Sequence, residues 1–391
     1  MPRYMSSSGD QKVPIQRPLV VLGLESSADD SCAAIVSSHR QILSNVVIKQ
    51  GQLLQKFDGI HPLHAQEAHE RNLPDAIHRA LQEAQLKLDQ LDAIAVTRGP
   101  GMRGCLSTCM ASAKALAAAA DLPLIGVHHM QAHALTPFLT EPEPPTFPFL
   151  TLLLSGGHTL MLLARSETDF EILATTHDES IGASLDKGSR ELEIPLELGN
   201  GSAGAALEVF AFGRDATDTS SHRAETALLN LFPVPFPKQL AFSFSGTRSA
   251  LHRILNSEPV NEMSEERRKE LAKAFMTAAF KQIGKKVELG VRHFEREQQK
   301  SGEVPASLGA LVVSGGVASN LFLRRLLRNK LDSMGYESTR LIFPPPSLCT
   351  DNAAMIAQVG LSRLLRGRVD SFHMDIKSKW SIEECESDFE K

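Results

Sequence analysis

Short apolar segments alternate with longer amphipathic segments along most of the chain. The apolar segments have the length of buried strands and lie at 19–23, 32–36, 93–96, 124–127, 149–154, 160–164, 311–313 and 341–343. The longest amphipathic segment follows Ser264, where apolar residues recur three and four positions apart as far as Phe294. This spacing predicts one long helix. Strands that alternate with helices are typical of an α/β protein.

Both halves of the chain begin with the pattern of a strand hairpin. In the first half, a polar stretch from Glu25 to Ser31 separates two apolar strands, so we expect hydroxyls and acids at the hairpin tip. In the second half, Phe149–Leu154 is expected to pair with Leu160–Ala164. Helices are expected at 66–88, 103–120, 321–331 and 352–365, and a loop-rich region at 199–221. Pro74 marks a kink or a second start in the first of these helices. The repetition predicts two similar α/β domains.

The segment Glu141–Pro145 is rich in proline and is the clearest linker in the chain. The expected segments are a stub over 1–17, a first domain over 18–147, a second domain over 148–351, a helical region over 352–375 that packs back on the first domain, and an acidic tail over 376–391. The stub is polar and contains one acid, so it fits either a disordered end or part of a mitochondrial targeting segment.

Composition narrows the class of protein. The chain is 42% apolar and 22% charged, which is ordinary for a soluble globular protein. A formal net charge of −5 gives no general field for nucleic acid, so an RNA partner must contact local basic patches. The candidates, each also typical of a solvated helix face, are Lys285, Lys286, Arg324, Arg325, Arg328, Arg363, Arg366 and Arg368.

The cysteines and the hydropathy exclude two further classes. Five cysteines without a Cys-x-x-Cys pair argue against a disulfide framework or a cysteine zinc site, and fit a reducing compartment. No apolar run is long enough to cross a membrane.

Two of the expected strands run directly into Ser-Gly-Gly, at Ser155–Gly157 and at Ser314–Gly316. A glycine pair in this position lets the backbone turn tightly and bring its N–H groups close to a ligand. A helix after the second turn adds a positive dipole end. One such motif is usually only a turn, but two of them indicate a nucleotide held between two related halves.

His129 and His133 are four residues apart, so on a helix they would share a face and could bind one metal ion. The alternative is a pair of surface or core histidines. Asp351 directly precedes an expected helix, so it could be an N-cap or the oxygen ligand that completes a two-His, one-carboxylate set. Zinc and iron(II) both suit that set. A zinc peptidase needs Glu after the first histidine, and Met130 occupies that place.

Three other motifs could carry chemistry. Asp29 and Asp30 could be turn formers, or could face a phosphate-bound metal or a leaving group. Asp186 could form an exposed pair with Lys187, or could hold ribose hydroxyls. Phe242–Gly246 predicts a strand that ends in a turn, whose hydroxyls and amides could also line a cleft.

Taken together, these motifs resemble the tRNA threonylcarbamoyladenosine transferases, once called O-sialoglycoprotein endopeptidases. The matching motifs occur in order along nearly the whole chain, at Leu22–Asp30, Gly99–Gly101, His128–His133, Leu154–Thr159, Leu185–Lys187, Phe242–Gly246, Ser314–Asn320 and Cys349–Ala353. The resemblance implies the actin-like ATPase fold, in which two duplicated α/β domains hold the ligand in the cleft between them.

The resemblance also implies an activity and its partners. Such enzymes transfer a threonylcarbamoyl group from threonylcarbamoyl-AMP to the adenosine 3′ of the anticodon in tRNAs that read codons beginning with A, and they release AMP. A separate synthase supplies the donor, and one divalent metal ion, zinc or iron(II), is expected per subunit. By this resemblance, His129, His133 and Asp351 match the metal ligands, and Asp29 matches an acid near the reacting group. The positions that match the adenylate site are Leu153, Leu154, Ser155, Gly156, Gly157, Asp186, Gly204, Glu208 and Asn320.

Several positions depart from the family pattern. Ser26 and Ala28 stand where Thr and Cys are usual, and Gln131 and Ala132 stand where Glu and Gly are usual. Ala183 stands where an acidic residue is usual and Glu67 where a basic residue is usual. The Gly-Gly-Pro segment that the family has after Asp186-Lys187 is poorly matched here. These changes resemble the mitochondrial branch, which works as a homodimer. We therefore expect an active enzyme in the mitochondrial matrix, with the cytoplasm as the alternative.

Two other classes of function remain open. A small-molecule kinase or ATPase on the same fold would give no role to His129, His133 and Asp351. Such an enzyme would hydrolyse ATP at a useful rate when ATP is the sole substrate. A non-catalytic nucleotide-binding partner is made plausible by the departures from the family pattern, and its loss would leave threonylcarbamoyladenosine in tRNA unchanged.

Overall fold

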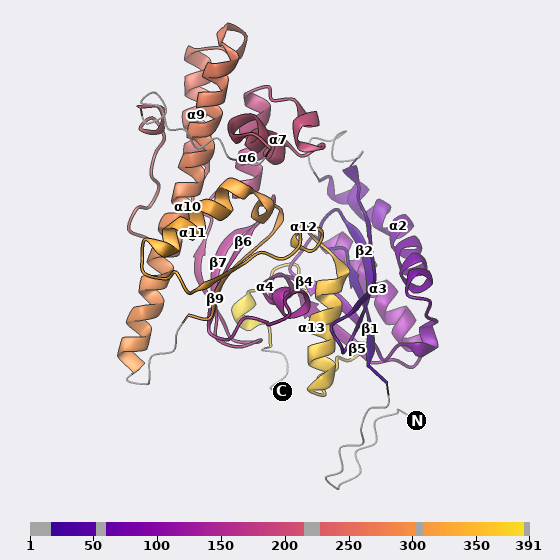
Figure 1. Ribbon diagram of the computed structural model, residues 1–391. Coiled ribbons are helices and arrows are strands. Elements are labelled where there is room, and N and C mark those ends of the chain that lie inside the picture. The colour runs from indigo at the N-terminus through magenta and orange to yellow at the C-terminus, as the bar shows by residue number, and fades with distance from the viewer. Residues whose placement is uncertain (1–16, 52–59, 215–226, 302–307, 387–391) are drawn as a thin grey trace. The chain divides into compact units, whose positions relative to one another are not determined.

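The computed structural model describes residues 17–51, 60–214, 227–301 and 308–386. They form two compact units (Figure 1). The first extends to Pro144 and resumes at Asp351, and the second extends from Pro145 to Thr350. The expected second domain includes residue 351, whereas Asp351 belongs to the first unit. The expected stub lies almost wholly outside the described residues.

The first unit is built on a five-stranded sheet in the order β3-β2-β1-β4-β5. Its strands are β1 (Val20–Glu25), β2 (Ser31–Ser37), β3 (Ile42–Ile48), β4 (Ala93–Gly99) and β5 (Leu124–His128). The strands β1, β2 and β3 form an antiparallel meander, and β4 and β5 run parallel to β1. The expected first hairpin is confirmed, and its register pairs Glu25 with Cys32.

Helices cover both faces of this first sheet. They are α2 (Pro62–Glu83), α3 (Arg103–Ala119), α4 (His129–Leu135), α5 (Pro137–Thr140) and α13 (Ala353–Leu365). Leu22 and Leu24 pack in a core with α2 and α3, and α13 lies on the other face (Figure 1). On that face a Cβ at Gly23 would lie 2.3 Å from the Ala353 carbonyl oxygen, so glycine permits the close approach of α13.

The second unit repeats this arrangement. Its sheet has the order β10-β9-β6-β7-β8, with β6 (Phe149–Leu154), β7 (Thr159–Ala164), β8 (Phe170–Thr175), β9 (Ala310–Ser314) and β10 (Arg340–Ile342). The strands β6, β7 and β8 are antiparallel, and β9 and β10 run parallel to β6. Order and direction thus match β1 to β5 strand for strand. The expectation of a duplicated, actin-like α/β fold is confirmed.

The helices of the second unit are α6 (Ile181–Glu191), α7 (Ala203–Phe212), α9 (Ser245–Ser257), α10 (Glu265–Ser301), α11 (Leu321–Asp332) and α12 (Pro346–Cys349). The long helix α10 buries the predicted apolar face, including Met276, Phe280 and Ile283. Short 3₁₀ turns lie at 88–90, 196–199, 260–262, 316–319 and 382–384.

Pro74 lies inside α2, so it does not start a second helix. Two other expectations from the sequence were wrong. Part of the region expected to be loop-rich is α7, whose N-terminus is capped by Ser202; residues 215–221 of that region lie outside the described residues. Phe242 makes only one bridge, to Thr176, and α9 begins at Ser245. No helix in the described ranges is both long and apolar enough to span a membrane.

Candidate functional site

The two candidate histidines lie at the end of β5, where the chain passes directly into α4. His129 and His133 are both buried, and their rings pack edge to face with centroids 4.7 Å apart. His128 caps α4 by accepting a hydrogen bond from the Gln131 backbone N–H. Because burial disfavours its charged form, the pKa of His128 falls to about 3. The helical spacing predicted from the sequence is therefore real.

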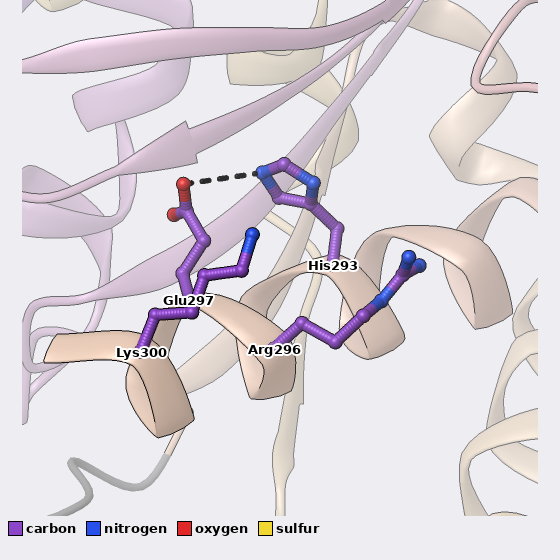
Figure 2. Close-up of a pocket in the computed structure, with 4 residues that line it drawn as sticks. All are labelled: His293, Arg296, Glu297 and Lys300. Atoms are coloured by element: carbon purple, nitrogen blue, oxygen red, sulfur yellow. Dashed lines mark ion pairs between the residues drawn. The ribbon is translucent and has the colours of Figure 1, made fainter. Parts of the chain in front are cut away.

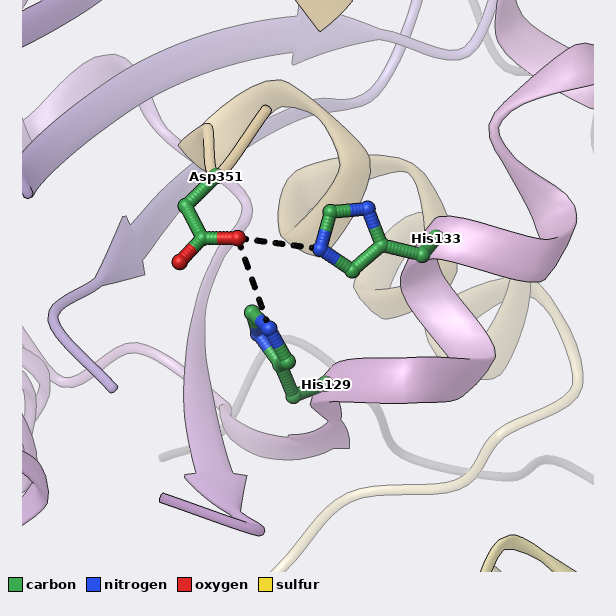
Figure 3. Close-up of side chains that lie close together, drawn as sticks. All are labelled: His129, His133 and Asp351. Atoms are coloured by element: carbon green, nitrogen blue, oxygen red, sulfur yellow. Dashed lines mark hydrogen bonds and ion pairs between the residues drawn. The ribbon is translucent and has the colours of Figure 1, made fainter. Parts of the chain in front are cut away.

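Asp351 completes this group from the far end of the chain. Its Oδ1 lies 3.0 Å from His133 Nε2 and 3.5 Å from His129 Nε2 (Figure 3). One ligand atom from each residue lies within 4.8 Å of the other two. The N-cap of α13 is the next residue, Asn352, whose side chain accepts from the Met355 N–H. Asp351 is therefore not the N-cap of α13.

The three side chains suit a divalent cation. Two imidazole nitrogens and one carboxylate oxygen are ligands for zinc or iron(II). Burial lowers the pKa of His129, but the carboxylates of Glu25 and Asp351 more than offset this and raise the pKa to about 9. The His129 ring is thus a place where positive charge is stabilised, as a bound cation would be.

Glu25 also contacts this group, although the sequence indicates only a polar turn at its position. It is the last residue of β1 and is 0% exposed. Its Oε2 lies 3.1 Å from His129 Nδ1. Burial raises the pKa of Glu25, but His129 more than offsets this, so the pKa lies below its usual value. The available signal was an acid that ends an otherwise apolar strand.

The hairpin tip carries Asp29 and Asp30, both partly buried. His69 of α2 holds the base of the tip, with Nδ1 2.7 Å from Ser31 Oγ and Nε2 3.0 Å from the Ala28 carbonyl oxygen. Burial and the charge of Asp351 raise the pKa of Asp29. Burial and then Asp29 raise the pKa of Asp30 to about 7. Neither carboxylate is fully solvated.

The Ser155 turn joins β6 to β7 and is backed by α6. Ser155 Oγ accepts from the N–H groups of Gly157 and His158, at 3.3 and 3.0 Å. Gly182 N–H donates to the Ser155 carbonyl, and a Cβ at Gly182 would lie 2.6 Å from that oxygen. Leu153 and Leu154 are buried, whereas Gly156 and Gly157 are exposed. A phosphate at this turn would replace Ser155 Oγ as the acceptor for these amides.

The remaining predicted adenylate residues connect α6, α7 and α11. Asp186 accepts from the Gly204 N–H at 2.8 Å. Glu208 accepts from the Phe322 N–H at 3.0 Å, and Asn320 caps α11 by accepting from Leu323. Burial raises the pKa of both Asp186 and Glu208. The structure thus groups Asp186 with Gly204, and Glu208 with the helix that Asn320 begins.

Other polar motifs have internal partners. Asp178 accepts from Ser243 Oγ, Ser245 Oγ and the Phe244 N–H, so the hydroxyls of Phe242–Gly246 serve the fold. Several predicted basic residues also contact the protein itself. Lys286 and Arg363 are buried, not solvated, and donate to the carbonyl oxygens of Pro235 and Gly126. Arg324 donates to the Ala318 carbonyl oxygen, and Arg328 donates to the carbonyl oxygens of Thr339 and Tyr336.

A second His–carboxylate group lies on the surface of the second unit. Glu171, His293 and Glu297 approach one another, beside a hollow of about 360 Å³ lined by His293, Arg296, Glu297 and Lys300 (Figure 2). Arg165 forms ion pairs with both glutamates. Because Arg165 already contacts both carboxylates, its positive charge would oppose the binding of a cation here.

Comparison with known proteins gives consistent matches. A family model described as tRNA N6-adenosine threonylcarbamoyltransferase matches residues 41–358. The chain is 34% identical over 385 residues to a probable mitochondrial tRNA N6-adenosine threonylcarbamoyltransferase of Arabidopsis thaliana, covering 94% of this chain and 75% of that protein. It is 37% identical over 375 residues to the tRNA N6-adenosine threonylcarbamoyltransferase of Bartonella henselae, covering 93% of this chain and 95% of that protein. The structure of component A of (R)-2-hydroxyglutaryl-CoA dehydratase from Acidaminococcus fermentans aligns with a TM-score of 0.49 and 13% identity, covering 89% of this chain and 99% of that chain.

Proposed function

Because the chain belongs to the tRNA N6-adenosine threonylcarbamoyltransferase family, we propose that it transfers a threonylcarbamoyl group from threonylcarbamoyl-AMP to tRNA. The acceptor is the adenosine 3′ of the anticodon in tRNAs that read codons beginning with A. The new bond joins the adenine N6 to the carbamoyl carbon, and the bond from that carbon to the phosphate oxygen breaks. AMP leaves and N6 loses a proton.

One observation carries the proposal. His129, His133 and Asp351 converge on one point from α4 and the start of α13. A divalent ion held there would act as a Lewis acid toward a carbonyl oxygen. A kinase or a simple nucleotide-binding protein gives this group no role.

The protein's own residues supply binding and orientation. Asp186 and Glu208 are carboxylates that could accept hydrogen bonds from ribose hydroxyls, with Asn320 nearby on the same helix start that Glu208 contacts. The amides of the Ser155 turn could donate to the phosphate. The adenine N6 is a weak nucleophile because it is conjugated with the purine ring. Positioning it, with Asp29 near the reacting group, should therefore supply much of the rate.

The cellular setting is part of the same proposal. We expect a homodimer in the mitochondrial matrix, with the cytoplasm as the alternative, and a separate synthase that supplies the donor. Support comes from the mitochondrial name of the Arabidopsis relative. Cell fractionation with a C-terminal tag and light scattering of the purified protein test location and oligomeric state.

Reconstitution with purified threonylcarbamoyl-AMP and an unmodified tRNA transcript tests the activity. Wild type should form threonylcarbamoyladenosine, and His133→Ala should lose at least ~100-fold of the rate and the bound metal. His293→Ala makes the same change in the Glu171, His293 and Glu297 group of the second unit and should behave as wild type. No product with wild type would refute the transferase, and equal rates for His133→Ala and wild type would refute the metal role. ATP hydrolysis without tRNA would favour the kinase class.

A further inference from the structure

Glu25 is a fully buried carboxylate that is held from three directions. Its Oε1 accepts from the Ser27 N–H at 2.5 Å. Its Oε2 accepts from the Thr97 hydroxyl on β4 and lies 3.1 Å from His129 Nδ1. Burying a charge costs several kcal/mol unless other groups compensate. Because both oxygens are fixed by separate elements, this carboxylate has little freedom to turn away from His129.

The contact with Glu25 decides which nitrogen of His129 carries the proton. An ionised carboxylate can only accept hydrogen bonds, so the nitrogen that faces it, Nδ1, must be the donor. In the neutral ring the lone pair then lies on Nε2. This is the atom that faces Asp351 Oδ1 at 3.5 Å.

His133 provides the contrast. Its Nε2 also faces Asp351, at 3.0 Å, but among the described residues no hydrogen-bond partner reaches its buried Nδ1. Of the two histidines, His129 is therefore the one whose Nδ1 is held by a carboxylate.

We propose that Glu25 is the positioning residue of the metal centre: it fixes the tautomer and ring orientation of His129, so that Nε2 is presented to the ion. The proposal rests on the metal centre of the proposed function. A Gln at this position would offer one acceptor oxygen for two donors, the Ser27 N–H and the Thr97 hydroxyl, and its NH2 group would take the place of the other oxygen. The ionised carboxylate accepts from both donors and also faces His129 Nδ1, which orients the imidazole toward a cation.

Metal binding by the full-length protein tests this. The probes are Zn²⁺ in competition with a chromophoric chelator, and Co²⁺ followed by its visible absorption. Wild type should bind one ion per chain. Glu25→Gln should still bind one ion, with affinity lower by ~10- to 100-fold and a changed Co²⁺ spectrum, because the amide no longer fixes the ring. Glu171→Gln alters the half-buried carboxylate beside His293 and should match wild type.

The outcomes separate this inference from the proposed function. Wild-type affinity and an unchanged Co²⁺ spectrum for Glu25→Gln would overturn the positioning role and leave the transferase untouched. If wild type bound no ion, the metal centre and the positioning role would both fail, whatever the transfer activity. Should circular dichroism show that Glu25→Gln does not fold, Glu25→Asp applies the same test. It keeps the charge but draws it back from His129, so wild-type affinity would again overturn the role.

Discussion

Asp30 should make the first unit less stable as the pH rises, and Asp30→Asn should remove that effect. Burial first, and then the charges of Asp29 and Asp351, raise the pKa of Asp30 to about 7 in the folded protein. In the unfolded chain an aspartate titrates near ~3.9. Between these two values the folded state binds more protons than the unfolded state. The stability that Asp30 contributes is therefore complete below pH ~4 and is lost as the pH rises toward 7.

The size of the effect follows from the two pKa values. A gap of about three pH units corresponds to about 4 kcal/mol, because each unit is worth ~1.4 kcal/mol. Asp30 is only partly buried, so solvent screening should reduce this to ~2 kcal/mol. Asparagine is neutral throughout. Asp30→Asn should therefore raise the free energy of unfolding by ~2 kcal/mol at pH 8 and leave it unchanged at pH 4.

Urea unfolding at pH 4, 6 and 8 measures this difference. Trp380 is the only tryptophan, and its ring packs against His128 in the first unit, so its fluorescence reports on that unit. A chelator should be present, because a bound cation would itself lower the pKa of nearby carboxylates. Asp75→Asn, on the exposed surface of α2, is the matched control and should change stability by less than ~0.5 kcal/mol. If the free energies of unfolding of wild type and Asp30→Asn differed by the same amount at pH 4 and at pH 8, the reasoning would be refuted.

Three further substitutions test other parts of the structure. Gly182→Ala places a Cβ 2.6 Å from the Ser155 carbonyl oxygen, so α6 must move away from the Ser155 turn. We expect the KM for the adenylate donor to rise at least ~10-fold while the metal content stays at the wild-type level. An unchanged KM would show that this turn does not bind the donor. Asp178→Ala removes the acceptor shared by Ser243, Phe244 and Ser245, so calorimetry should show a Tm lower by ~5–10 °C, whereas an equal Tm would show that these bonds add no stability. Asp29→Asn should lower kcat by ~10²-fold or more in the reconstituted reaction, and wild-type turnover would remove Asp29 from the site.

The sequence predicted elements wherever one periodicity dominated. The apolar face of α10 and the runs in β1, β6 and β9 are buried as expected. By contrast, β3 escaped notice because it is an edge strand with Ser44 and Asn45 at its centre and partly exposed positions along its length. The helix α7 escaped notice because it follows a Gly-rich segment, and its signal was one residue, the N-cap Ser202.

The site was predictable only in part, because only some of its contacts join residues that are close in the sequence. Local spacing indicated that His129 and His133 share a helix face, but Asp351 is 218 residues from His133, and only family resemblance could connect them. Glu25 was missed because whether it belongs to a turn or a strand depends on register. The pairing of Glu25 with Cys32 extends β1 by the residue that brings this carboxylate to His129.

The interrupted path of the first unit has a consequence for its biosynthesis. A ribosome makes β1 to β5 early, but Asp351 and α13, which packs on β1, β2 and β4, emerge only after the whole second unit. Until then the nascent chain exposes the sheet face around Gly23 that α13 later covers. The second unit, a continuous stretch of chain, can therefore fold before the first is complete. A message cut short before codon 351 would yield two histidines without their carboxylate.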